Sequence, residues 1–253
     1  MKIFFINLDR SEDRLGFILN QFAESHLREN LVRWPGIDGS KDALDQYYTQ
    51  VDQTKSNKLK GRDLTTGQIG CYASHYEIWN RVLENNEAAI ILEDDIDIEI
   101  NRLEDFVSCC QDLSENIECL RLFPNSTKRA KKITVDSCYY FSISKHTRGP
   151  MGAQGYYLTP KGAEKFLNSS TSWFLPVDLY MDAFWIHKVD CYGIDPPILK
   201  HSGFSGTRTG TANRQLRPKA RIRKEFLALV TSSKRFWHNF KFYLAHLRDW
   251  WMS

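Results

Sequence analysis

The chain has 253 residues, of which 42% are hydrophobic and 13% aromatic, and its formal net charge is +3. This composition supplies enough apolar side chains for one packed α/β domain and excludes a globally disordered chain. The nearly neutral charge gives no reason to expect a nucleic-acid partner, and no segment reaches the roughly 18–20 apolar residues of a membrane span.

Strand-like and helix-like segments alternate through the first half of the chain. The apolar run at the N-terminus predicts a strand, because it turns charged too soon for an export signal. Asp9 and Glu12 have the spacing of a capping box at the start of the first helix. Residues 50–62 are polar and rich in lysine, which predicts a mobile surface loop. Apolar periodicity predicts strands at residues 2–7, 31–34 and 88–92 and helices at residues 11–26 and 65–86.

The alternation continues to about residue 200, which favours an α/β sandwich with a mainly parallel sheet. Residues 203–211 are rich in glycine and threonine, which predicts a flexible loop, and the chain beyond it is basic. We therefore expect a domain over residues 1–212 and a basic amphipathic helical tail over residues 213–253. The strands predicted in this half are residues 119–123, 133–143 and 153–158, and the helices are residues 160–168 and 178–189.

The six cysteines form neither a C-x-x-C pair nor a framework spacing. With no export signal, this predicts reduced and mostly buried thiols and a cytoplasmic protein. The cysteines are Cys71, Cys109, Cys110, Cys119, Cys138 and Cys191.

The most informative segment is an apolar run that ends in three adjacent carboxylates, Glu93, Asp94 and Asp95. Like charges this close repel one another, and at the carboxyl end of a buried strand they commonly hold a divalent metal that in turn binds phosphates. Extended geometry places Glu93 and Asp95 on the same side. An ordinary solvated loop explains the segment equally well.

The turn after the first strand is a candidate binding site for the phosphates of a nucleotide. Asn7 ends the strand, and Arg10 and Arg14 share one face of the following helix, whose free N–H groups suit a diphosphate. The alternative is a solvated helix start in which the arginines pair with Glu12 and Asp13.

Three further segments carry candidate residues. Ser74 and His75 follow a glycine-containing helix start that a ligand could approach closely, although a satisfied core histidine explains His75 as well. Asp178 begins a helix, where it serves either as a general base or as an N-cap, and Asp182 lies one turn later. His201 ends a strand and is a candidate third ligand for Mn²⁺ or an exposed side chain without function.

Taken in order, these segments resemble glycosyltransferase family 25, the lipooligosaccharide sugar transferases. The matching motifs are Ile6-Asn7-Leu8-Asp9-Arg10 with Arg14, Gly36-Ile37-Asp38-Gly39, Leu64-Thr65 with Gly70-Cys71 and Ser74-His75, Leu92-Glu93-Asp94-Asp95, Gly155-Tyr156-Tyr157-Leu158 with Gly162-Ala163, and Pro176-Val177-Asp178.

The resemblance implies a GT-A-like domain that transfers a hexose with inversion, typically from UDP-galactose, to a lipooligosaccharide or lipopolysaccharide acceptor. It implies Mn²⁺ or Mg²⁺ held by Asp95 and Glu93, to which we add His201. Asn7, Arg10, Arg14, Ser74, His75, Glu93 and Asp94 would bind the UDP-sugar. Asp178, or Asp182 one turn away, would act as the base. The alternatives are a metal-dependent phosphatase or nucleotide-sugar hydrolase, and a catalytically silent sugar-nucleotide-binding scaffold.

The tail combines basic residues with an apolar stripe, which is typical of helices that lie in a membrane interface. We expect peripheral attachment to the inner face of a bacterial inner membrane through residues after about Lys219. The alternative is that the stripe packs on the domain or forms a dimer interface, and Thr231-Ser232-Ser233 would divide the tail into two helices in either case. The stripe is Ile222, Phe226, Leu229, Phe236, Phe240, Tyr243, Leu247 and Trp250.

Overall fold

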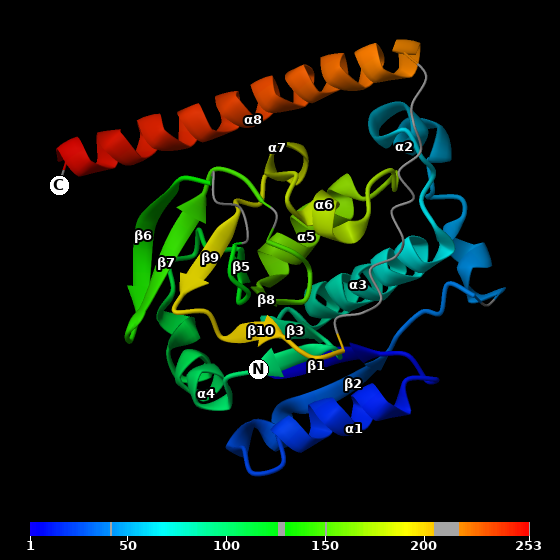
Figure 1. Ribbon diagram of the computed structural model, residues 1–253. Helices are drawn as coiled ribbons and strands as arrows, with labels where there is room; N and C mark the ends of the chain where they lie inside the picture. The colour runs from blue at the N-terminus through cyan, green and yellow to red at the C-terminus, as the bar shows by residue number, and fades with distance from the viewer. Residues whose placement is uncertain (41, 126–129, 150, 205–217, 253) are drawn as a thin grey trace.

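The computed structural model describes residues 1–40, 42–125, 130–149, 151–204 and 218–252 (Figure 1). An eight-stranded sheet has the order β2-β1-β3-β8-β5-β9-β7-β6, and β4 pairs with β10 in a separate two-stranded sheet. The strands are β1 Lys2–Asn7, β2 Leu31–Pro35, β3 Ala89–Glu93, β4 Ile96–Ile98, β5 Cys119–Arg121, β6 Lys132–Cys138, β7 Phe141–His146, β8 Gly155–Leu158, β9 Tyr192–Asp195 and β10 Leu199–His201.

The large sheet is mixed. β1 runs parallel to β2 and β3, and β5 runs parallel to β9. β8 is antiparallel to both of its neighbours, and so is β7. The predicted α/β sandwich is therefore confirmed, but two reversed strands interrupt the parallel arrangement.

Helices cover both faces of the sheet and create two cores. Phe4 and Ile91 point to the face covered by α3, α5 and α6, whereas their neighbours Ile3, Phe5 and Ile90 point to the face covered by α1 and α4. The helices are α1 Glu12–Gln21, α2 Gln53–Lys60, α3 Thr66–Asn85, α4 Ile100–Cys109, α5 Pro160–Ser169, α6 Val177–Met181, α7 Phe184–His187 and α8 Pro218–Met252, with 3₁₀ turns at His26–Asn30, Asp42–Tyr47 and Cys110–Asp112.

Two predictions for the first half of the chain are wrong in detail. Helix α1 ends at Gln21, and its N-cap is Ser11 without a side-chain cap, so the predicted Asp9 capping box is absent. The predicted loop at residues 50–62 contains α2, because Asp52 accepts a hydrogen bond from the Lys55 amide and Gly61 ends the helix at a φ of 77°. The sequence contains both capping residues of α2, Asp52 and Gly61. It has almost no apolar residue between them, so no apolar periodicity indicates a helix.

The single strand predicted at residues 133–143 is a hairpin of β6 and β7. Its turn contains Tyr139, whose φ is 56°, and Tyr140, which hydrogen-bonds to Asp105. Aromatic residues are unusual at such a turn, so the pattern looked like a continuous strand. The helix predicted at residues 178–189 is also divided, into α6 and α7, with Ala183 at the N-cap of the second.

A disulfide joins Cys109 at the end of α4 to Cys138 at the end of β6. The expectation of reduced thiols is therefore wrong for this pair. The two residues are 29 positions apart, and only the packing of the helix on the hairpin brings their Cα atoms to 5.7 Å, a separation that a disulfide spans. Of the free cysteines, Cys71 is exposed, and Cys110, Cys119 and Cys191 are buried.

Helix α8 lies across one side of the molecule and contacts α2 and α7 (Figure 1). It is continuous through residues 231–233, so the predicted division into two helices is wrong. His238 bonds to Asp190 (2.8 Å) and Asn239 to the carbonyl of Thr147 (3.0 Å), which attaches one side of the helix to the domain. The expected boundary near residue 212 and most of the loop at residues 203–211 fall outside the described residues.

Other side chains of α8 point to solvent. Among the described residues of α8, the exposed large apolar side chains are Leu229, Val230, Phe236, Trp237, Phe240 and Leu244. At about 100° per residue, these six fall within an arc of about 120°. The side chains of residues 218–227 and 246–252, which include Ile222, Phe226, Leu247 and Trp250 of the predicted stripe, are outside the description. Among the described helices, none combines the length and the apolarity that crossing a bilayer requires.

Candidate functional site

Three carboxylates lie where β3 ends. Glu93 is the last residue of the strand, and Asp94 and Asp95 form a bend before β4. Because β1 and β3 are parallel neighbours, the turn that follows Asn7 lies at the same edge of the sheet. The sheet therefore brings together two segments that are more than 80 positions apart in the chain.

Asp94 is held by groups from this turn. Asn7 Nδ2 donates to Asp94 Oδ2 at 2.7 Å, and Arg14 Nη1 lies 3.2 Å from Oδ1. Arg33 Nε donates to Asn7 Oδ1 at 2.9 Å, which orients the amide toward the carboxylate. Burial raises the pKa of Asp94, while the contacts with Asn7 and Arg14 oppose that rise. Both of its oxygens are thus engaged by protein donors.

Asp95 is less tightly held. Its Oδ2 lies 3.5 Å from Arg14, and its backbone carbonyl accepts a 2.6 Å hydrogen bond from Ser202. Desolvation and then the charge of Glu93 raise the pKa of Asp95 to about 6, although Arg14 opposes the shift. A bound cation would therefore stabilise the charged form of Asp95 more than that of Asp94, whose oxygens already have protein donors.

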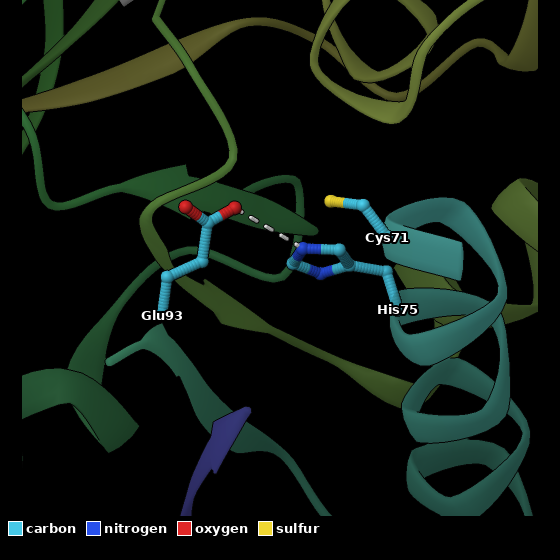
Figure 2. Close-up of side chains that lie close together, drawn as sticks. All are labelled: Cys71, His75 and Glu93. Carbon is cyan, nitrogen blue, oxygen red and sulfur yellow. Dashed lines mark ion pairs between the residues drawn. The ribbon is translucent and has the colours of Figure 1, made fainter. Parts of the chain in front are cut away.

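Glu93 faces helix α3 (Figure 2). The Cys71 sulfur, a His75 ring nitrogen and a Glu93 carboxylate oxygen all lie within 4.8 Å of one another. His75 is fully buried, and its Nδ1 is 2.8 Å from the hydroxyl of Tyr156, which also accepts from Trp79 Nε1 at 2.8 Å. Desolvation and then the charges of Glu93, Asp178 and Asp95 raise the pKa of the Cys71 thiol.

Asp178 and Asp182 have different surroundings although both belong to the α6 segment. Asp178 is half-buried, and desolvation raises its pKa, with a smaller contribution from the charge of Glu93. Asp182 is buried beside Arg121 (3.8 Å) and accepts from the Met151 amide at 3.3 Å. Desolvation raises the pKa of Asp182 to about 6. Only Asp178 therefore belongs to the half-exposed carboxylate group around Glu93.

Arg10 and Ser74 position a loop. Arg10 pairs with Asp38, and the Ser74 hydroxyl accepts from the Ile37 amide at 2.8 Å and donates to the Gly70 carbonyl at 2.8 Å. A Cβ on Gly70 would overlap the Ile37 carbonyl oxygen, so glycine permits the close approach of loop and helix. Ser74 uses its hydroxyl within the protein, whereas Arg10 remains largely exposed.

His201 is exposed on β10, with its ring 4.6 Å from that of Phe123. Within the described part of the chain, Asp95, Glu93 and His201 do not gather their ligand atoms as Cys71, His75 and Glu93 do. A cavity of about 280 Å³ lies against β7 and β9, and none of the predicted site residues lines it.

The family model "Glycosyltransferase family 25 (LPS biosynthesis protein)" matches residues 1–181. The chain belongs to glycosyltransferase family 25. The match runs from β1 to the end of α6, so it includes both carboxylate segments and Asp178. Asp182, His201 and α8 lie beyond it, and their predicted roles have no support from the family.

Three relatives of this family 25 chain align over most of its length. A procollagen lysyl hydroxylase and glycosyltransferase of Acanthamoeba polyphaga mimivirus is 24% identical over 79% of the chain and 24% of the relative. Procollagen galactosyltransferase 1 of Danio rerio is 24% identical over 76% of the chain and 32% of the relative. The probable inactive glycosyltransferase 25 family member 3 of Rattus norvegicus is 23% identical over 81% of the chain and 39% of the relative. The chain spans about a quarter to two fifths of these proteins.

Two side chains of this site had no functional role in the sequence analysis. The sequence predicts only a buried thiol at Cys71 and a strand residue at Tyr156, although both lie within the residues that the family model matches. The available signal was the four-residue spacing of Cys71 and His75, which places both on one face of a helix. Nothing in the sequence indicated that Tyr156 would contact His75.

Proposed function

We propose that this chain transfers a hexose, galactose from UDP-galactose, to a lipooligosaccharide or lipopolysaccharide acceptor with inversion at the anomeric carbon. The observation that carries the proposal is the convergence of two carboxylate segments. The charge of Glu93 acts on both Asp95 at the strand end and Asp178 at the start of α6. One site thus offers carboxylates that can bind a cation and a further carboxylate, Asp178, that can accept the proton of a hydroxyl group.

A divalent cation fits the strand end. Asp95 and Glu93 would hold Mn²⁺ or Mg²⁺, because both are incompletely buried and burial already disfavours the charged form of Asp95. Asp94 orients the segment, since Asn7 and Arg14 occupy its oxygens. When bound, such an ion neutralises negative charge on a departing nucleotide diphosphate. The His201 ligand has no supporting contact.

Asp178 is the proposed base. Its half-buried carboxylate removes a proton from the acceptor hydroxyl as that oxygen attacks the anomeric carbon, and a raised pKa improves a carboxylate as a proton acceptor. A single displacement inverts the configuration and needs no covalent sugar–enzyme intermediate. Asp182 is a positioning residue in this scheme, because it faces Arg121 and the Met151 amide.

The choice of substrates rests on the names of the family and of one relative. The family description names lipopolysaccharide biosynthesis, and one relative is a procollagen galactosyltransferase. The test is a panel of UDP-sugars assayed with Mn²⁺ and truncated lipooligosaccharide, with the anomeric configuration of the product read by NMR. Retention of configuration contradicts the proposed displacement. Hydrolysis without an acceptor requirement favours a nucleotide-sugar hydrolase, and saturable binding without turnover favours the silent scaffold.

We also propose that α8 attaches the protein to the inner face of the inner membrane. The six exposed apolar residues form one stripe, and Lys234 and Lys241 follow at its edge on the helical wheel. Aromatic rings beside lysines suit an interface with anionic lipid. Attachment there would place the protein near a lipid-anchored acceptor.

A further inference from the structure

The cluster of Cys71, His75 and Glu93 has an unsatisfied polar atom at its centre. His75 is 0% exposed, and its Nε2 has no hydrogen-bond partner. Glu93 Oε1 is 3.6 Å away, which is too long for a hydrogen bond. Figure 2 shows the ring, the carboxylate and the thiol turned toward one another.

The separation of these atoms matches ligands around a metal ion. Two ligands bound at about 2.0–2.1 Å in a tetrahedron lie about 3.3 Å apart, close to the observed distance between Nε2 and Oε1. Cys71 and His75 are one helical turn apart on α3, so both side chains approach Glu93 from the same helix face. Only small movements would bring all three donor atoms onto one ion.

We propose that Cys71, His75 and Glu93 form a zinc site. A thiolate, an imidazole and a carboxylate together prefer Zn²⁺ to the harder Mn²⁺ or Mg²⁺, which favour oxygen ligands. Three protein ligands leave a fourth position for water or an anionic oxygen, and Cys71 and Glu93 are both incompletely buried. The site shares Glu93 with the cation proposed at Asp95, whereas Cys71 and His75 take no part in that proposal.

Surrounding residues support the ligands. Tyr156 Oη is 2.8 Å from Nδ1 of His75, and Trp79 Nε1 donates to the same oxygen. With zinc on Nε2, the ring proton resides on Nδ1 and is donated to Tyr156, the arrangement that commonly orients a metal-bound histidine. The thiol proton is released to solvent, and the charges of Asp95 and Asp178 near Cys71 add to the attraction for a cation.

Cobalt(II) titration of the metal-free, full-length protein tests this site without any sugar nucleotide. The expected result is one equivalent of Co²⁺ with a thiolate-to-cobalt charge-transfer band that Zn²⁺ abolishes. Cys71→Ser should lose the band, and Glu93→Gln should weaken binding. Cys110→Ser is the matched control, because this thiol is buried on the opposite face of the sheet, and it should keep the band.

A second pair of variants tests the hydrogen bond between His75 and Tyr156. Tyr156→Phe should weaken zinc binding about 10- to 100-fold, whereas Tyr157→Phe, whose ring faces the other core, should leave it unchanged. No charge-transfer band in the wild type, or a band that survives Cys71→Ser, overturns the zinc site. Sugar transfer with Mn²⁺ in a protein that lacks the band would leave the proposed function standing, and a band without transfer would support the zinc site alone.

Discussion

Arg14 Nη1 lies 3.2 Å from Oδ1 of Asp94, although the two residues are 80 positions apart in the sequence. The guanidinium is mostly covered, and it also reaches Asp95. A cation from the first helix therefore stabilises the acidic end of the third strand before any metal binds. This contact explains how adjacent like charges persist in the folded protein.

Replacing Arg14 should weaken donor binding more than replacing Arg10. Arg14→Ala removes the positive charge from both aspartates, whereas Arg10→Ala removes a largely exposed guanidinium that pairs with Asp38. Loss of one charged hydrogen bond from this guanidinium to the diphosphate of the donor, worth about 1.5–3 kcal/mol, corresponds to a rise of at least about tenfold in donor Kd. Calorimetric titration with UDP-sugar and Mn²⁺ measures it, with the exposed Arg28→Ala as control. Equal affinities in all three variants contradict this role.

Stability should fall as the pH rises from about 4 to 6. The pKa of Asp95 is about 6 in the folded protein and 3.8 as the ordinary value, so the folded state holds its proton more tightly. The stability that this tighter proton binding contributes is fully present below pH 3.8. It is lost as the pH rises through about 6, and the free energy of unfolding falls by up to about 3 kcal/mol. Asp182 adds a loss in the same window.

Asp95→Asn should therefore flatten the pH dependence of the unfolding free energy and stabilise the metal-free protein at neutral pH. Asp95→Ala should nearly abolish sugar transfer. Denaturant unfolding at pH 4 and pH 7 measures the first effect, and the exposed Asp97→Asn should behave as wild type. Full transfer activity in Asp95→Ala, or in excess chelator, excludes the cation proposed at this strand end.

Asp178→Asn should bind the donor normally and lose about 10²–10⁴-fold in kcat, because no carboxylate remains to remove the proton from the substrate hydroxyl. Asp182→Asn should instead leave kcat nearly unchanged, since this side chain faces Arg121 and the Met151 amide and not the carboxylates around Glu93. Donor titration, steady-state kinetics and thermal melting separate the two. If Asp182→Asn loses more kcat than Asp178→Asn while it remains folded, the base lies one turn later.

The exposed face of α8 should carry membrane binding. Phe236→Ser combined with Trp237→Ser should abolish flotation with anionic liposomes and leave the melting temperature nearly unchanged, because both rings are more than half exposed. The matched control is Asn239→Ala on the docked face, which should lower the melting temperature and keep flotation. If the wild-type protein does not float with anionic liposomes, α8 is a structural element only.

The apolar periodicity of the sequence determined most of the fold. Strands β1, β2 and β3 and helix α3 begin and end within about one residue of prediction, because burial of a regular stripe dominates their stability. The acidic motif and Asp178 were likewise evident as candidate residues. Helix α2 and the β6–β7 hairpin were missed, because capping by Asp52 and a turn made of two tyrosines leave no apolar pattern.

Only the tertiary structure decided which of these residues meet. The parallel pairing of β1 with β3 brings Asn7 and Arg14 to Asp94, and the packing of α4 on the hairpin joins Cys109 to Cys138. Helix α3 crosses the sheet so that His75 lies between Glu93 and Tyr156. Periodicity records which side of an element is buried but carries no information about its partner across the sheet, so these contacts follow from strand order and packing alone.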